Sequence, residues 1–173
     1  MSADRALTAL VVPVPEAEHA LRPWRAASGV EGRHELSAHV TILHPFLEPA
    51  EIEGELERLR AHFAAVARFS FALRETRRYP GGVLYLAPEP VQAFATLLRD
   101  LHALYPDRPP YGCAYPDVVP HCTVAHVDDD ALLDAADAAV RRHLPLHALA
   151  LEAWLLELVA EGWSVRARLP FGA

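Results

Sequence analysis

The sequence repeats one four-residue pattern, a histidine, any residue, a threonine and a hydrophobic residue, at two distant places. The first copy begins at His39 and the second at His121. Each copy lies in a run of apolar and β-branched residues, over residues 38–43 and 122–127. Runs of this kind are typical of buried strands. The chain is therefore expected to contain two buried strands that carry the same pattern, called the tetrad below.

The spacing within each tetrad fixes the direction of its polar side chains. Residues two apart in a strand point to the same face, about 7 Å apart. His39 should therefore project beside Thr41, and His121 beside Thr123. Two such strands lying side by side would present two imidazoles and two hydroxyls to one small space.

The rest of the chain alternates between strand-like and helix-like patterns. Apolar residues at spacings of three and four predict helices over residues 51–66 and 91–105. Helical composition predicts another over residues 16–27, bent or restarted by Pro23, and the acidic residues 128–130 resemble an N-cap region for a helix that runs to about Arg142. Shorter apolar runs bounded by Pro and Gly predict further strands over residues 6–14, 69–73, 83–86, 149–159 and 163–169. The order predicts an α+β fold in one domain over residues 1–173, with two lobes that are each a small, mainly antiparallel sheet with outer helices. The tetrads would then face each other across a central groove.

Composition excludes several kinds of function. All 16 basic residues are arginine, so a phosphate-loop lysine, a Schiff base and a lysyl-nucleotide intermediate are ruled out. The net charge of −7 argues against long nucleic acid as a partner, because such binding depends on neutralising phosphates. The sequence shows no signal peptide and no run of about 20 apolar residues, so we expect a cytoplasmic monomer that does not bind membranes.

The tetrads suit acid–base chemistry on a phosphodiester, above all a strained 2′,3′-cyclic one. Imidazole has an ordinary pKa of about 6.5, so near neutral pH one ring can accept a proton while another donates one. The hydroxyls of Thr41 and Thr123 would donate hydrogen bonds to the phosphate oxygens, where charge develops in the transition state. This chemistry requires no metal and no cofactor.

Other interpretations of the same residues remain open. His44 and His126 extend both tetrads and invite a zinc site, but an offset of five in a strand points to the opposite face. We expect these two histidines to be structural or to lie at strand ends. A nucleotide-binding module with little turnover and a metal-dependent hydrolase are the alternative functions.

Three tyrosines are candidate substrate contacts. Tyr85 lies in a predicted strand, and Tyr111 and Tyr115 lie in the loop before the second tetrad. Aromatic rings stack on nucleobases, although packing in the core or in a lid is the simpler explanation for each tyrosine. Arg77 and Arg78 could contact a phosphate or form a solvated surface pair.

With both tetrads in view, the chain resembles the two-histidine (2H) phosphoesterase superfamily, which contains 2′-5′ RNA ligase-like proteins and cyclic nucleotide phosphodiesterases. The segments that carry the resemblance are residues 39–46 and 120–125, supported by residues 83–86, 110–112 and 169–172. The likeness therefore extends over nearly the whole chain.

The resemblance implies a bilobal α+β fold with pseudo-two-fold symmetry and a metal-free groove. It implies that His39 and His121 are the catalytic acid and base, in an order that it does not assign, and that Thr41 and Thr123 bind the phosphate. Family substrates are small nucleotides or RNA termini: 2′,3′-cyclic phosphates, ADP-ribose 1″,2″-cyclic phosphate and 2′-5′-linked oligonucleotides. Family ligation reverses phosphodiester cleavage without ATP, which agrees with a chain that lacks lysine.

Overall fold

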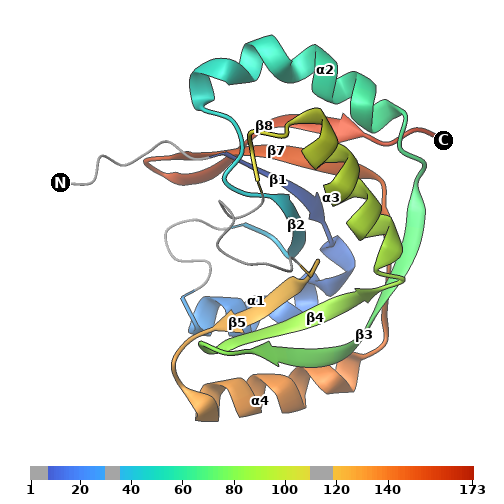
Figure 1. Ribbon diagram of the computed structural model, residues 1–173. Helices are drawn as coiled ribbons and strands as arrows, with labels where there is room; N and C mark the ends of the chain where they lie inside the picture. The colour runs from blue at the N-terminus through green and yellow to red at the C-terminus, as the bar shows by residue number, and fades with distance from the viewer. Residues whose placement is uncertain (1–7, 30–35, 110–118) are drawn as a thin grey trace.

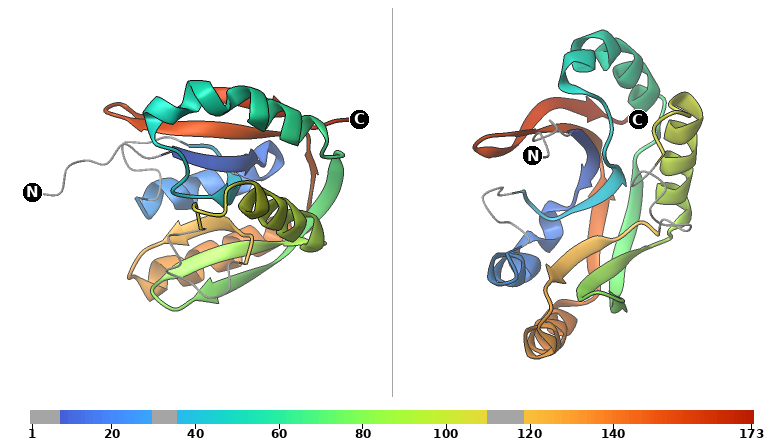
Figure 2. Two further views of the ribbon diagram at one scale, coloured as in Figure 1. Left: turned by 45° about the horizontal axis from the view of Figure 1, so that its top comes forward. Right: turned by 60° about the vertical axis from the view of Figure 1, so that its left-hand side comes forward.

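One continuous antiparallel sheet of eight strands forms the centre of the protein. In the computed structural model, which describes residues 8–29, 36–109 and 119–173, the strand order is β6-β3-β4-β5-β2-β1-β7-β8. The strands are β1 (Thr8–Pro13), β2 (His39–Leu43), β3 (Phe69–Tyr79), β4 (Val83–Glu89), β5 (Cys122–His126), β6 (Leu146–Ala150), β7 (Glu152–Val159) and β8 (Gly162–Pro170). The sheet is strongly curved (Figure 2).

Four helices lie around this sheet: α1 (Glu18–Ala27), α2 (Ile52–Ala64), α3 (Gln92–Leu104) and α4 (Asp130–Val140). The helix α2 lies beside the end of the sheet formed by β7 and β8, and α4 lies along the end formed by β3, β4 and β5 (Figure 1). Side chains from all four helices share one apolar core with the buried residues of the tetrad strands; the helical members include Leu21, Phe63, Phe94 and Leu133.

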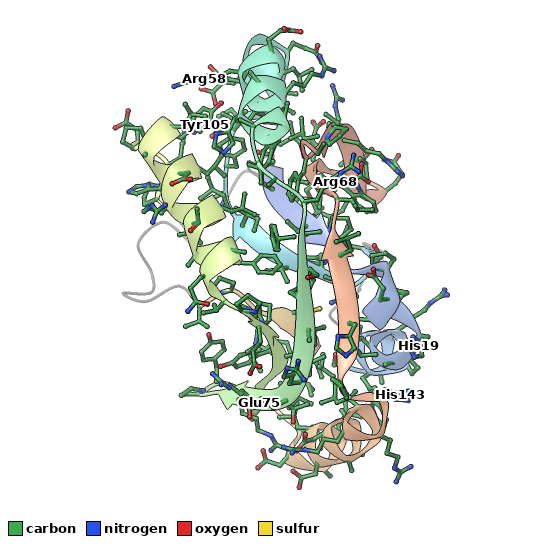
Figure 3. All side chains as sticks on the ribbon, turned by 90° about the vertical axis from the view of Figure 1, so that its right-hand side faces the viewer. His19, Arg58, Arg68, Glu75, Tyr105 and His143 are labelled. Carbon is green, nitrogen blue, oxygen red and sulfur yellow. The ribbon has the colours of Figure 1, made fainter. Side chains whose placement is uncertain are left out.

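Side-chain contacts join the helices in pairs (Figure 3). The guanidinium of Arg58 in α2 lies 4.8 Å from the ring centre of Tyr105, which follows α3. The hydroxyl of Tyr105 donates to Glu55 at 2.7 Å. His19 of α1 and His143 beyond α4 meet edge to face, with ring centres 5.2 Å apart. These contacts hold the two members of each helix pair together.

The structure confirms the α+β class and corrects details of the prediction. In place of two separate small sheets there is one sheet, because β2 and β5 pair with each other and so satisfy backbone groups that separate sheets would leave unpaired. The strand β6 was not predicted. The helix α1 continues through Pro23, and Pro23 itself is exposed. The buried residues Leu21 and Arg25 anchor the helix on either side of it.

None of the helices in the described ranges has the length and apolar character that crossing a membrane would require.

The core predicts where the fold is most sensitive to substitution. Phe63 is fully buried and stacks on Phe171, with ring centres 5.8 Å apart. We expect Phe63→Ala to reduce the free energy of unfolding by about 3–5 kcal/mol, because it removes apolar burial and leaves a cavity. Urea denaturation would measure the loss. Leu149→Ala is the matched control, since Leu149 is 45% exposed and its truncation should change stability by less than about 0.5 kcal/mol.

Candidate active site

The two tetrads lie on adjacent strands at the centre of the sheet. The strands β2 and β5 are antiparallel, and Val40 is the partner of Cys122. In an antiparallel pair this register sets His39 opposite Thr123 and Thr41 opposite His121, with Cα atoms of opposed residues about 4.5–5.5 Å apart. The structure therefore brings all four predicted residues to one place.

The alternation of each strand separates its polar side chains from the core. Val40 and Cys122 are buried with the helices, whereas the histidines and threonines of both tetrads are half-buried. Because neighbouring strand residues point to opposite faces, the four polar side chains lie on the face away from the main core. Cys122 accordingly points away from the site.

Both histidine rings are oriented by the same kind of local hydrogen bond. Nδ1 of His39 lies 2.7 Å from the carbonyl oxygen of Ser37, and Nδ1 of His121 lies 2.8 Å from that of Val119. A carbonyl oxygen only accepts hydrogen bonds, so each Nδ1 carries the hydrogen. In each neutral ring Nε2 is then the basic nitrogen that can exchange a proton with a substrate.

Two tyrosines pack against His121. The ring of Tyr85 lies 5.3 Å and that of Tyr79 lies 5.5 Å from its ring, both edge to face, and the two tyrosines stack on each other at 4.3 Å. Tyr85 is 5% exposed, so its ring is packed against other side chains of the protein. The predicted contacts Tyr111 and Tyr115 lie outside the described residues.

A different environment surrounds His39. The guanidinium of Arg25, from α1, is almost completely buried beside it and donates to the carbonyl oxygen of Thr123 at 3.1 Å and to that of Leu36 at 2.9 Å. A cavity of about 190 Å³ opens next to these groups. Its lining is Ala9, Val11, Arg25, Leu36, His39, Thr41, His44, Leu156 and Trp163. This side of the site is therefore largely apolar, with one buried cation.

The additional histidines lie at strand ends, as predicted, but in unlike places. His44 follows β2 and lines the same cavity as His39. Because the strand ends at Leu43, the alternation of side chains between the two faces does not extend to His44. Its ring meets Trp163 edge to face at 5.8 Å, and burial lowers its pKa. His126 ends β5 and is exposed. Within the described ranges, no three His, Cys, Asp or Glu side chains are grouped to hold a metal ion.

Burial and charge change the proton affinity of the two catalytic candidates. Burial above all, together with the neighbouring Arg25 and His121, lowers the pKa of His39 to about 4, against the opposing effect of the hydrogen bond to Ser37. Burial also lowers the pKa of His121, and its hydrogen bond to Val119 opposes this. Both rings are therefore predominantly neutral at pH 7 in the protein without substrate.

The surface arginines considered above lie in ion pairs. Arg77 pairs with Glu75, and Arg78 pairs with Asp134 at 2.6 Å. Arg77 also lines a second cavity, of about 520 Å³, together with Arg74, Ala87, Pro88, Glu89, Pro90, Val91, Gln92 and Val119. These arginines are half-exposed, unlike Arg25.

Arg25 was not predicted as a site residue, although its position in the helical pattern indicated that it is buried. Arg25 stands four residues after the buried Leu21 in an amphipathic helix. That spacing places both on one face of the helix, so an arginine is directed toward the core. A charged residue at a core position indicates a specific partner or a function.

Comparisons with known proteins show the family of the chain and solved structures with a similar fold. A family model described as the 2′-5′ RNA ligase superfamily matches residues 13–160. The Escherichia coli LigT structure in complex with 3′-AMP shares 16% identity over 97% of this chain and 99% of its own, with a TM-score of 0.66. TT0787 of Thermus thermophilus shares 18% identity over 95% and 97% of the two chains, with a TM-score of 0.67. No curated protein sequence matches the chain.

The lowered proton affinities predict how the histidines titrate. We expect the His39 ring to titrate near pH 4 and the His121 ring below its ordinary value of 6.5, as followed by NMR of the ring carbons against pH. In urea both rings should return to ordinary values, because burial is lost. A His39 midpoint at or above 6.5 in the folded protein would contradict this prediction.

The same shifts predict a loss of stability in acid. Between pH 6.5 and 4 the unfolded chain binds a proton at residue 39 that the folded protein does not bind, so the free energy of unfolding falls as pH falls through this window. Urea denaturation at pH 7 and pH 5 would measure the loss. The His39→Gln variant is the control and should show a shallower dependence.

Proposed function

The chain belongs to the 2′-5′ RNA ligase superfamily, and we propose that it is a metal-independent phosphodiesterase for cyclic or 2′-5′-linked ribonucleotide phosphates. Membership supports an activity of the 2H phosphoesterase or ligase type. The observation that carries the finer proposal is the pairing of Val40 with Cys122, which sets His39 and His121 on one face with matched Nδ1 hydrogen bonds.

The proposed reaction divides proton transfer between the two rings. In hydrolysis of a 2′,3′-cyclic phosphate, one Nε2 takes a proton from water while the water oxygen bonds to phosphorus. The bond from phosphorus to one ribose oxygen breaks, and the other Nε2 donates its proton to that oxygen. Each transfer is worth about 10²–10⁴-fold in rate. Water then exchanges protons with both rings and restores the starting state.

Thr41 and Thr123 fit the role of phosphate donors in this reaction. Each is half-buried and stands opposite a histidine of the other strand. A β-branched side chain in a paired strand has few rotamers, so its hydroxyl is held in place before the phosphate gains charge. The reverse reaction, in which a ribose hydroxyl attacks a cyclic phosphate, would join RNA ends through a 2′-5′ bond without ATP.

A small nucleotide or an RNA terminus is the proposed substrate. Solved structures of E. coli LigT contain phosphate, 3′-AMP or NADP⁺, which supports a ligand of this class. The net charge of −7 favours a short ligand over long nucleic acid. Tyr85, Tyr111 and Tyr115 remain candidate contacts, and we propose that the enzyme acts as a cytoplasmic monomer without a cofactor.

Turnover of nucleoside 2′,3′-cyclic phosphates in EDTA tests the proposal. We expect hydrolysis in EDTA, and we expect His39→Ala and His121→Ala each to lower kcat by at least about 10²-fold. Thr41→Val and Thr123→Val, which keep the shape and remove the hydroxyl, should lower kcat less than the histidine variants do. Chromatography of the products would measure the rates and identify the 2′ or 3′ isomer.

The controls separate this function from its alternatives. His147→Ala alters an exposed histidine of β6 and should retain full activity. Activity that survives both tetrad substitutions would refute the roles of the histidines. Loss of activity in EDTA would favour a metal-dependent hydrolase, and nucleotide binding without turnover of any cyclic phosphate would favour a binding module.

A further inference from the structure

Arg25 is a buried arginine in contact with the site that carries both tetrads. Its side chain is 1% exposed and is among the largest fully buried side chains of the described residues. Arginine is seldom buried to this extent, because removing its charge from water is costly. A residue that is retained at this cost has a specific role in the fold or in the function.

The hydrogen bonds of Arg25 connect the second tetrad to the segment that precedes the first. Nη1 donates to the carbonyl oxygen of Thr123, inside the second tetrad. Nη2 donates to the carbonyl oxygen of Leu36, three residues before His39. The guanidinium is planar and keeps its charge at all relevant pH values. Arg25 therefore fixes the backbone on both sides of the β2–β5 junction and places a permanent positive charge there.

This charge acts on the two histidines unequally. Burial and, after it, the positive charge of Arg25 lower the pKa of His39, whereas the pKa of His121 is lowered by burial and raised by its hydrogen bond to the carbonyl of Val119. The asymmetry follows from geometry, since Arg25 and His39 line the same cavity while His121 packs against the rings of Tyr79 and Tyr85.

Other ionisable groups around His39 do not reverse this effect. Glu18 of α1 accepts a hydrogen bond from the backbone of Ala38 at 2.6 Å. Cys122 of β5 lies on the core side, and burial raises the pKa of its thiol to about 11, so it is neutral. His44 lines the same cavity and, like His121, has a pKa lowered by burial. Beyond Tyr85, Arg77 is exposed and paired with Glu75.

We propose that Arg25 is a positioning residue that sets the direction of proton transfer, with His39 as the base and His121 as the acid in hydrolysis. Nε2 of His39 would take the proton of the attacking water as its oxygen bonds to phosphorus. Nε2 of His121 would give its proton to the ribose oxygen whose bond to phosphorus breaks. In the reverse reaction the two roles exchange. This inference rests on the proposed phosphodiesterase function.

The two histidine rings must hold one proton between them, and their surroundings determine which ring holds it. An imidazolium at position 39 would stand beside a buried guanidinium, where water screens the repulsion poorly. An imidazolium at position 121 would instead pack against the rings of Tyr79 and Tyr85 and donate a hydrogen bond to the carbonyl oxygen of Val119. When the anionic substrate draws one proton into the site, that proton is therefore held on His121.

Two substitutions separate the charge of Arg25 from its hydrogen bonds. Arg25→Gln keeps a donor and removes the charge, whereas Arg25→Lys keeps the charge and fewer donors. NMR titration of the His39 and His121 rings and pH profiles of kcat/KM would be recorded for both variants. Arg22→Gln is the matched control, since Arg22 is an exposed arginine of the same helix.

We expect Arg25→Gln to raise the midpoint of His39 above about 4 but not to 6.5, because burial is the larger cause and persists, and to change that of His121 much less. The acid limb of kcat/KM, which reports the base, should move to higher pH by the same shift. Arg25→Lys and Arg22→Gln should retain the wild-type midpoints. A purely structural role predicts instead that both substitutions at position 25 lower stability and activity without moving the acid limb.

Several results would overturn the inference. A wild-type His121 midpoint below that of His39 would do so, and this measurement holds even where Arg25→Gln fails to fold. An unchanged His39 midpoint in folded Arg25→Gln, or equal shifts of both rings, would also refute it. Because the titrations need no substrate, a protein without turnover that still shows the expected midpoints would refute the proposed function and leave the electrostatic effect of Arg25 established.

Discussion

The pairing of β2 with β5 is the interaction on which the rest of the molecule depends. It joins the strands β6, β3, β4 and β5 to the strands β2, β1, β7 and β8, so that eight strands form one sheet. The junction brings together residues that are far apart in the chain, with Val40 opposite Cys122. Without it, the two halves would each leave a central strand edge unpaired, and the two histidines would have no common site.

The same strands carry the core and the candidate site, so the fold and the geometry of that site depend on each other. Alternate residues of β2 enter the helix-covered core as Val40 and Ile42, while His39 and Thr41 lie on the other face. A shift of the register by one residue would bury the polar set and expose the apolar set. Burial of Val40 and Cys122 therefore stabilises the register that aligns the histidines.

Local pattern was enough to predict most elements and the four residues of the candidate site. The period-two alternation placed each histidine beside its threonine, apolar spacing of three and four predicted α2 and α3, and helical composition and an acidic N-cap region predicted α1 and α4. The strand β6 was missed because Leu146, Ala148 and Ala150, its buried residues, form only a short alternation next to a charged segment.

Long-range features escaped the sequence for physical reasons. The single sheet depends on which strand edges meet, and pairing between distant strands leaves no mark in either strand by itself. Arg25 presents the same difficulty, because its significance comes from two carbonyl groups supplied by other segments. Tyr85 was noticed as an aromatic residue, but its packing against His121 became visible only with the fold.

The two tetrads show how a site built from similar strands acquires unlike halves. Their local structure is the same, since each ring is oriented by a carbonyl two residues earlier in the chain. Their surroundings differ, since α1 brings a buried cation to His39 and the hairpin of β3 and β4 brings two tyrosines to His121. In the proposed reaction one imidazole must be neutral while the other is protonated, and unequal proton affinities favour one assignment of these states. The repeated strands supply two equivalent imidazoles, and the elements packed around them make the two unequal.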